Sequence, residues 1–130
     1  MNHFEHERLD VSRAAIDFLV VADEIATGLP RGRGYLVDQL RRAATSIPLN
    51  IAEGAGEFSP GDKAIFYRMA RRSATECAAI LDASRALNLA DSQLLSNGRA
   101  LLLRVVAMLT AMVLRLNDPG SGSGAGSGST

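Results

Sequence analysis

The feature that most constrains this chain is a helical repeat of apolar residues. In residues 34–53 they recur every three or four positions, at Leu36, Leu40, Ala44, Ile47 and Ile51. That spacing places them on one side of an α-helix, and residues 91–116 show the same repeat with larger aliphatic side chains. An amphipathic helix must bury its apolar side against another element, so the repeat predicts a packed helical domain.

Turn residues divide the chain into four predicted helices. These cover residues 10–28, 34–53, 60–88 and 91–116. Asp10 or Ser12 can cap the first helix, and Ser59 followed by Pro60 is a start signal for the third. The connections are short, which favours antiparallel neighbours. The predicted fold class is therefore all-α, an up-down-up-down antiparallel four-helix bundle.

The predicted organisation is one domain with two flexible ends. Residues 1–9 are expected to form a flexible N-terminus and residues 10–117 the bundle. Residues 118–130 form a Gly/Ser-rich segment that is expected to carry no fold. This segment is a linker, a natural tail or a remnant of engineering, and the sequence leaves these alternatives open.

Three of the helices have further expected features. Pro48 falls inside the second apolar repeat, so a kink is expected rather than a break. In the first helix, Ile16, Leu19 and Val20 are assigned to the apolar side. The predicted core of the third helix is Ile65, Phe66, Met69, Ala70, Ser73, Cys77, Ile80, Leu81 and Ser84. Cys77 is expected to be a buried packing residue, not a reactive thiol.

A second, narrower apolar strip is predicted on the outer side of residues 91–116. It contains Leu103, Ala107 and Leu114 together with Ala100, and it lies between lines of arginine and threonine residues. An apolar strip with charged borders is typical of a subunit interface. We therefore expect these residues to contact another copy of the chain.

The formal net charge is zero, but the charge is unevenly distributed. Residues 1–30 carry six acidic residues and two arginines, whereas residues 59–117 carry four acidic and eight basic residues. The candidate phosphate-binding residues are Arg41, Arg42, Arg68, Arg71 and Arg72. The alternative is that these arginines pair with Asp17, Asp23 or Glu24 of a neighbouring subunit.

No pattern of an enzyme is present. A di-iron bundle needs Glu-x-x-His steps, and both histidines, His3 and His6, precede the first predicted helix. No Ser/His/Asp arrangement or phosphate loop occurs, so no catalytic residue, metal site or cofactor is predicted. Arginines interrupt the most apolar stretch and the N-terminus lacks a signal core, so no membrane association and a cytoplasmic location are expected.

The run RRAATSIPLNIAEG at residues 41–54, followed by the step from Ser73 to Glu76, resembles a known family. It is similar to the four-helix bundle proteins encoded by intervening sequences within 23S ribosomal RNA genes. The resemblance implies a barrel-like homopentamer. It also implies structural roles for the motif residues, which are Pro48, Asn50, Glu53, Gly54 and Glu76. Asn50 is expected to satisfy backbone groups freed by the kink or to reach another helix, and Glu53 to meet an arginine of another helix or subunit.

The same family includes the accessory protein of diversity-generating retroelements, which binds nucleic acid and a reverse transcriptase. Those accessory proteins are strongly basic, whereas this chain is neutral. The leading hypothesis is a non-enzymatic, ring-forming interaction protein. The second is an accessory protein that binds RNA or DNA and works with a reverse transcriptase or ribosomal RNA, and the third is a metal-dependent enzyme.

Overall fold

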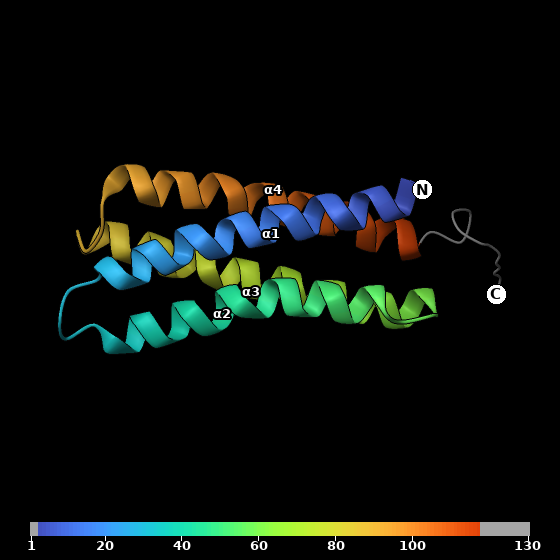
Figure 1. Ribbon diagram of the computed structural model, residues 1–130, viewed down its shortest axis with the longest axis horizontal. Helices are drawn as coiled ribbons and strands as arrows, with labels where there is room; N and C mark the ends of the chain where they lie inside the picture. Colours follow the sequence, from blue (N-terminus) through green and yellow to red (C-terminus); the bar gives the residue numbers. More distant parts are fainter. Residues whose placement is uncertain (1–2, 118–130) are drawn as a thin grey trace.

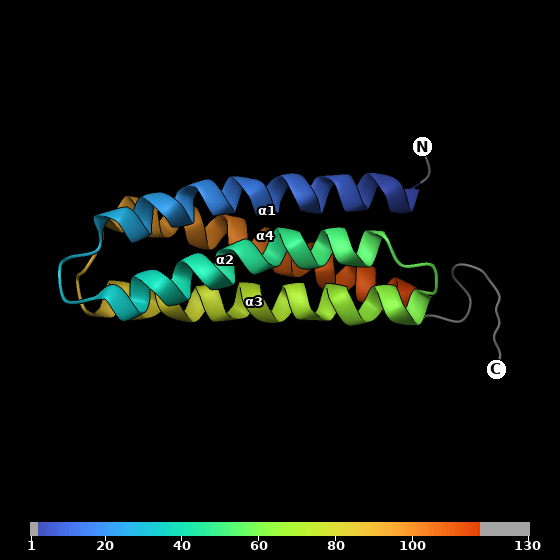
Figure 2. The same ribbon diagram turned by 60° about the horizontal axis from the view of Figure 1, so that its bottom comes forward.

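The computed structural model describes residues 3–117 and shows four α-helices in these residues. They are α1 (His3–Gly28), α2 (Gly34–Ala55), α3 (Pro60–Ala86) and α4 (Ser92–Asn117). Each helix packs against its neighbours in sequence, and α4 returns to α1. Figures 1 and 2 show the resulting antiparallel bundle, in which the connections alternate between its two ends. The predicted fold class is confirmed.

Side chains cap the starts of α3 and α4, and the cap of α3 is the predicted one. The hydroxyl of Ser59 accepts a hydrogen bond of 3.1 Å from the backbone N–H of Asp62, and Pro60 occupies the first helical position. The Asp91 carboxylate accepts a bond of 2.9 Å from the backbone N–H of Leu94. Each side chain satisfies an amide group that the first turn leaves without a helical partner.

The start of α1 was predicted wrongly, because the helix begins at His3 and not at Asp10 or Ser12. Residues 3–9 form its first turns and are fixed by contacts with distant parts of the chain. The ring of Phe4 lies 6.5 Å from the ring of Tyr67 in α3, and Glu7 forms an ion pair with Arg115 of α4. The Gly/Ser-rich segment at 118–130 lies outside the described residues.

The second helix continues through Pro48 to Ala55 and bends midway along its length (Figure 2). All of its predicted core residues are buried, namely Leu36, Leu40, Ala44, Ile47 and Ile51. The core face of α4 also agrees with the prediction, since Leu95, Leu102, Val105, Leu109, Met112 and Val113 are buried. Large aliphatic side chains therefore identified the core sides of α2 and α4 correctly.

The core side of α1 is displaced from the predicted one, and so is that of the first turns of α3, whereas Ala70, Cys77, Ile80, Leu81 and Ser84 are buried as predicted. Ile16 and Val20 of α1 are exposed, and so are Ile65 and Met69 of α3. The buried residues of α1 are Val11, Ala14, Ala15, Phe18, Ala22, Ile25 and Ala26. Those of α3 are Ala64, Tyr67, Ala70, Ala74, Cys77, Ile80, Leu81 and Ser84. Alanines form much of both surfaces, and small side chains at a helix contact allow the helix axes to approach closely.

By length and composition alone, α4 is the one helix among residues 3–117 that is apolar enough to cross a membrane. Its most apolar side is buried in the bundle, where it packs against α1 and α3. A core helix of a bundle has the same composition, so this property follows from its place in the fold.

Candidate interaction surfaces

A short chain of polar side chains joins α2 to α3, and we call it the polar seam. The hydroxyl of Ser46 lies 2.9 Å from the hydroxyl of Ser73 across the two helices. The side-chain amide of Asn50 donates to the Ser46 hydroxyl at 2.9 Å. One level further along the bundle, the Gln39 amide donates to the Glu76 carboxylate at 3.2 Å. The Ser46–Ser73 and Gln39–Glu76 bonds therefore connect the two helices, and Asn50 supports Ser46 from within α2.

Asn50 also bonds to the backbone of its own helix, at a carbonyl other than that of Ala44, which Pro48 leaves without a helical donor. Its amide donates to the carbonyl oxygen of Ser46 at 2.9 Å, in the turn that contains Pro48. Glu53, in contrast, is exposed and forms no ion pair with any residue from 3 to 117. An arginine of another subunit remains its predicted partner.

The polar seam gives a first prediction on stability. Replacing Ser73 with alanine leaves the Ser46 hydroxyl without its partner on α3, in a partly buried place. We expect the free energy of unfolding to fall by about 1 kcal/mol. Urea denaturation followed by circular dichroism measures this change. Thr75→Ala is the matched control, since the Thr75 hydroxyl is exposed and bonds only to the carbonyl of Arg71 in its own helix. A Ser73→Ala protein as stable as this control would show that the seam contributes nothing.

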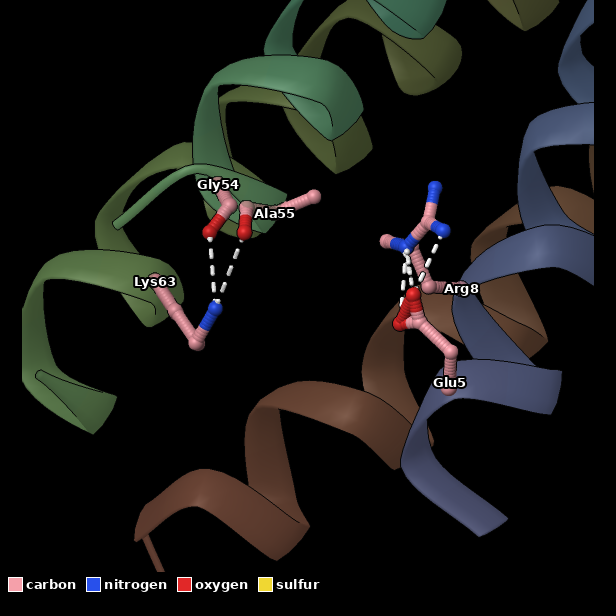
Figure 3. A network of polar contacts seen from close by, with 5 residues as sticks. All are labelled: Glu5, Arg8, Gly54, Ala55 and Lys63. Atoms are coloured by element: carbon pink, nitrogen blue, oxygen red, sulfur yellow. Dashed lines mark hydrogen bonds and ion pairs between the residues drawn. The ribbon is translucent and has the colours of Figure 1, made fainter. Parts of the chain in front are cut away.

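Gly54 of α2 lies directly against Tyr67 of α3. The side chain of Tyr67 is fully buried, and a Cβ at Gly54 would lie 2.6 Å from its Cε1 atom. The Lys63 ammonium donates to the carbonyls of Gly54 and Ala55 at 3.3 and 3.2 Å, and so satisfies the end of α2 (Figure 3). The end of the motif thus has a packing role, since Gly54 leaves room for an aromatic ring.

Tyr67 is covered from the α1 side. Phe4 packs near its ring, and Glu5 and Arg8 form an ion pair at the same end of the bundle (Figure 3). Burial raises the pKa of the Tyr67 phenol, since the phenolate would lose its hydration there. The tyrosine is therefore a neutral core residue.

The structure divides the five candidate phosphate-binding arginines into two groups. Arg68, Arg71 and Arg72 surround a hollow of about 340 Å³ on α3, together with Met69 and Thr75. Arg41 and Arg42 line a separate hollow on α2 with Thr45, Ser46, Leu49 and Asn50. The three arginines of α3 thus form one basic surface, and the α2 pair is not part of that hollow.

The partners of these arginines differ as well. Arg41 binds Asp23 at 3.3 Å and Thr27 at 3.1 Å, both on α1, and Arg71 donates to the Thr110 hydroxyl of α4 at 3.3 Å. Arg42, Arg68 and Arg72 are exposed and make no ion pair with any described residue. Among the five candidate arginines, these three have the guanidinium groups most available to an external anion.

The apolar strip predicted on α4 is exposed in the single chain. Leu103 and Leu114 retain 62 % and 64 % of their accessible surface, and Ala107 is exposed between them. Arg99 and Arg104 border the strip. A second exposed apolar stripe, which the sequence interpretation missed, lies on α1 at Leu9, Ile16 and Val20. A second helical repeat in the same segment, through Val11, Ala15, Phe18 and Ala22, marks the core side of α1 and could have shown that this stripe is exposed.

Cys77 is fully buried, and burial raises the pKa of its thiol to about 12, with a smaller effect from the Glu76 charge. Since the thiolate is the reactive form, we expect the native protein not to react with a thiol-specific reagent such as DTNB at pH 8. The same protein in about 6 M guanidinium chloride should release one equivalent of chromophore. Rapid reaction of the native protein would contradict this burial.

Within residues 3–117, no three histidine, cysteine or acidic side chains gather into a group that could hold a metal ion. The surfaces described above are therefore the candidates for interaction in this part of the chain. They consist of arginines at two places, on α3 and on α2, and of apolar residues at two others, on α4 and on α1.

Comparison with known proteins agrees with the motif. The family described as 23S rRNA-intervening sequence protein matches residues 7–111, a span that reaches all four helices and includes the polar seam and Gly54. No curated protein is significantly similar to the chain. The match covers well over half of the sequence, and this chain belongs to the 23S rRNA-intervening sequence protein family.

Proposed function

We propose that this protein is a non-enzymatic interaction protein of the cytoplasm that assembles into a homo-oligomeric ring, with five copies as the family resemblance implies. The observation that carries the proposal is the exposed apolar strip of α4, at Leu103, Ala107 and Leu114. A contiguous apolar strip with charged borders is typical of a surface that a partner covers.

The distribution of charge supports self-assembly. Acidic residues predominate on α1, whereas arginines border the α4 strip and surround the α3 hollow. Two different surfaces of opposite charge on one chain can meet head to tail, and such contacts repeat until a ring closes. A ring would then present each remaining surface once per subunit to its partner.

Native mass spectrometry of the full chain tests this proposal. At micromolar concentration we expect one dominant species of five chains, which survives dilution to about 1 μM because each copy is held by two neighbours. A monomer at the same concentration would overturn the proposal of self-assembly.

The second candidate function is a nucleic-acid-binding accessory protein that works with a reverse transcriptase or ribosomal RNA. It is supported by the three arginines around the α3 hollow, of which Arg68 and Arg72 have no ion-pair partner among residues 3–117. Each arginine can neutralise one phosphate, and a ring would repeat the surface around its axis. The family description names an intervening sequence of 23S rRNA, so structured ribosomal RNA is the first ligand to test.

For this candidate, we expect the double substitution Arg68→Gln and Arg72→Gln to weaken RNA binding at least about tenfold at ~50 mM salt. The slope of log K against log salt should become shallower by about one or two units. Fluorescence anisotropy with labelled RNA measures both effects. Arg85→Gln is the control for loss of charge, since Arg85 is held by Ser92 and Ser96 at the other end of α3. Absence of binding of the parent protein to both RNA and DNA would remove this candidate.

A further inference from the structure

We propose that the α4 strip of one copy packs antiparallel against the α1 stripe of the next copy. In this contact Val20 faces Leu103, Ile16 faces Ala107, and Leu9 faces Leu114. The inference rests on the proposed self-assembly and adds the two surfaces, their direction and their register. Its partner is a second copy of this chain.

The spacing of the exposed residues carries the register. On α1, Leu9, Ile16 and Val20 are separated by seven and then four residues, and on α4, Leu103, Ala107 and Leu114 are separated by four and then seven. The two stripes therefore have equal length, about 16 Å at ~1.5 Å per residue. They match only when the helices run in opposite directions. The larger Ile16 then lies over the small Ala107, as interlocking helix surfaces require.

The charges at the edges fit the same direction. In this register Arg104 of α4 comes level with position 19 of the neighbouring α1, beside Asp17. Arg104 and Asp17 are both exposed, and neither forms an ion pair within the described part of its own chain. Arg99, on the other edge of the strip, comes level with Asp23 and Glu24. In this register the arginines at the edges of the α4 strip thus lie level with acidic residues of the neighbouring α1.

The register is also compatible with a closed ring of copies. Within one chain α1 and α4 are antiparallel, and a Cβ at Gly98 would lie 3.4 Å from Val21 and 3.5 Å from Ile25. Residue 98 is thus level with about residue 23 of its own α1, and Val20 with about residue 101. The proposed contact places Val20 level with Leu103 of the next copy, a difference of about 3 Å along the bundle. Neighbouring copies are then related by rotation with little shift along the bundle, and a shift near zero is the condition for a closed ring and not for a filament.

Cross-linking tests the pairing in the intact protein. The double variant Val20→Cys with Leu103→Cys keeps the buried Cys77 and is treated with a short bis-maleimide. We expect a ladder of covalent oligomers on a denaturing gel, up to the size of the ring. The matched control is Val20→Cys with Leu114→Cys, since Leu103 and Leu114 are equally exposed, at 62 % and 64 %. In the proposed register the control should remain uncross-linked.

Native mass spectrometry of both variants separates the possible failures. An oligomer in which the control forms the ladder, or in which neither variant does, overturns this contact and leaves the proposed assembly intact. A monomer overturns both. As a second measurement, Arg104→Asp should decrease the cross-linked fraction of the Val20→Cys, Leu103→Cys protein several-fold, and adding Asp17→Arg should restore it. Failure of the charge exchange to restore cross-linking would contradict the Arg104–Asp17 pair.

Discussion

Replacing Gly54 with alanine is expected to lower the free energy of unfolding by about 2 kcal/mol or more, although alanine is the better helix former. The new Cβ would lie 2.6 Å from Cε1 and 2.9 Å from Cδ1 of Tyr67. The ring is fully buried and packs near Phe4, so it cannot turn away without displacing the first turns of α1. The overlap must be relieved by moving α2 away from α3, which weakens the contacts around it.

Urea denaturation measures this effect, with Gly61→Ala as the control. Gly61 lies in the first turn of α3, and a Cβ there has no atom within 4 Å, so this variant should be as stable as the parent or more stable. The double variant Gly54→Ala with Tyr67→Leu should lose less stability than the two single variants together, because leucine removes the overlapping ring. Equal stability of the Gly54→Ala and Gly61→Ala proteins would show that Gly54 has no packing role.

Replacing Leu103 with aspartate is expected to dissociate the oligomer while the single chain remains folded. Removal of a buried leucine from a contact costs about 2–3 kcal/mol, and burial of a carboxylate near the acidic α1 adds to this cost. Each contact should therefore weaken at least about a hundredfold. The bundle itself should be unaffected, because Leu103 is 62 % exposed in the isolated chain and supports no core contact.

Light scattering gives the mass of this variant, and circular dichroism reports its helix content. Leu49→Asp is a matched control, since Leu49 is 61 % exposed but lies on α2, away from the strip. We expect the Leu49 variant to retain the mass of the parent. If the Leu103 variant also retains it, the strip is not a subunit contact.

The sequence predicted α2 and α4 well because their core sides carry large aliphatic residues. Leu40, Ile47, Leu102 and Leu109 give a strong periodic signal, and all four are fully or almost fully buried. The cap at Ser59 was also predictable, since it depends only on residues close in sequence. The Gly54 contact was not, because its partner Tyr67 lies on the next helix.

The phase of α1 and that of the first turns of α3 were predicted wrongly for a common reason. Alanines occupy much of the core side there, at Ala14, Ala15 and Ala22 in α1 and at Ala64 in α3. An alanine adds little to a hydrophobic repeat, so the larger exposed residues dominated the pattern. The space available to a side chain depends on the neighbouring helix, which a single helix does not reveal.

The candidate surfaces show the same limit. The α4 strip could be predicted because arginines mark its edges, and the structure leaves it exposed. The α1 stripe was hidden, because Ile16 and Val20 had been assigned to the core. The sequence interpretation therefore identified the α4 surface of the proposed subunit contact but not the α1 surface. The polar seam was partly visible, since Asn50 and Glu76 belong to the motif. The Ser46–Ser73 and Gln39–Glu76 bonds became clear only from the packing of α2 on α3.

Hydroxyl-radical footprinting of the assembled protein measures most directly whether the α4 strip is covered. Leu49, Leu103 and Leu114 have nearly equal exposure in the single chain, at 61 %, 62 % and 64 %, so Leu49 serves as the internal reference. We predict that Leu103 and Leu114 are modified several-fold more slowly than Leu49 in the native protein. In the monomeric Leu103→Asp variant, Leu114 should be modified as fast as Leu49. Equal modification of the three leucines in the native protein would mean that water, and not a second copy, covers this face of α4.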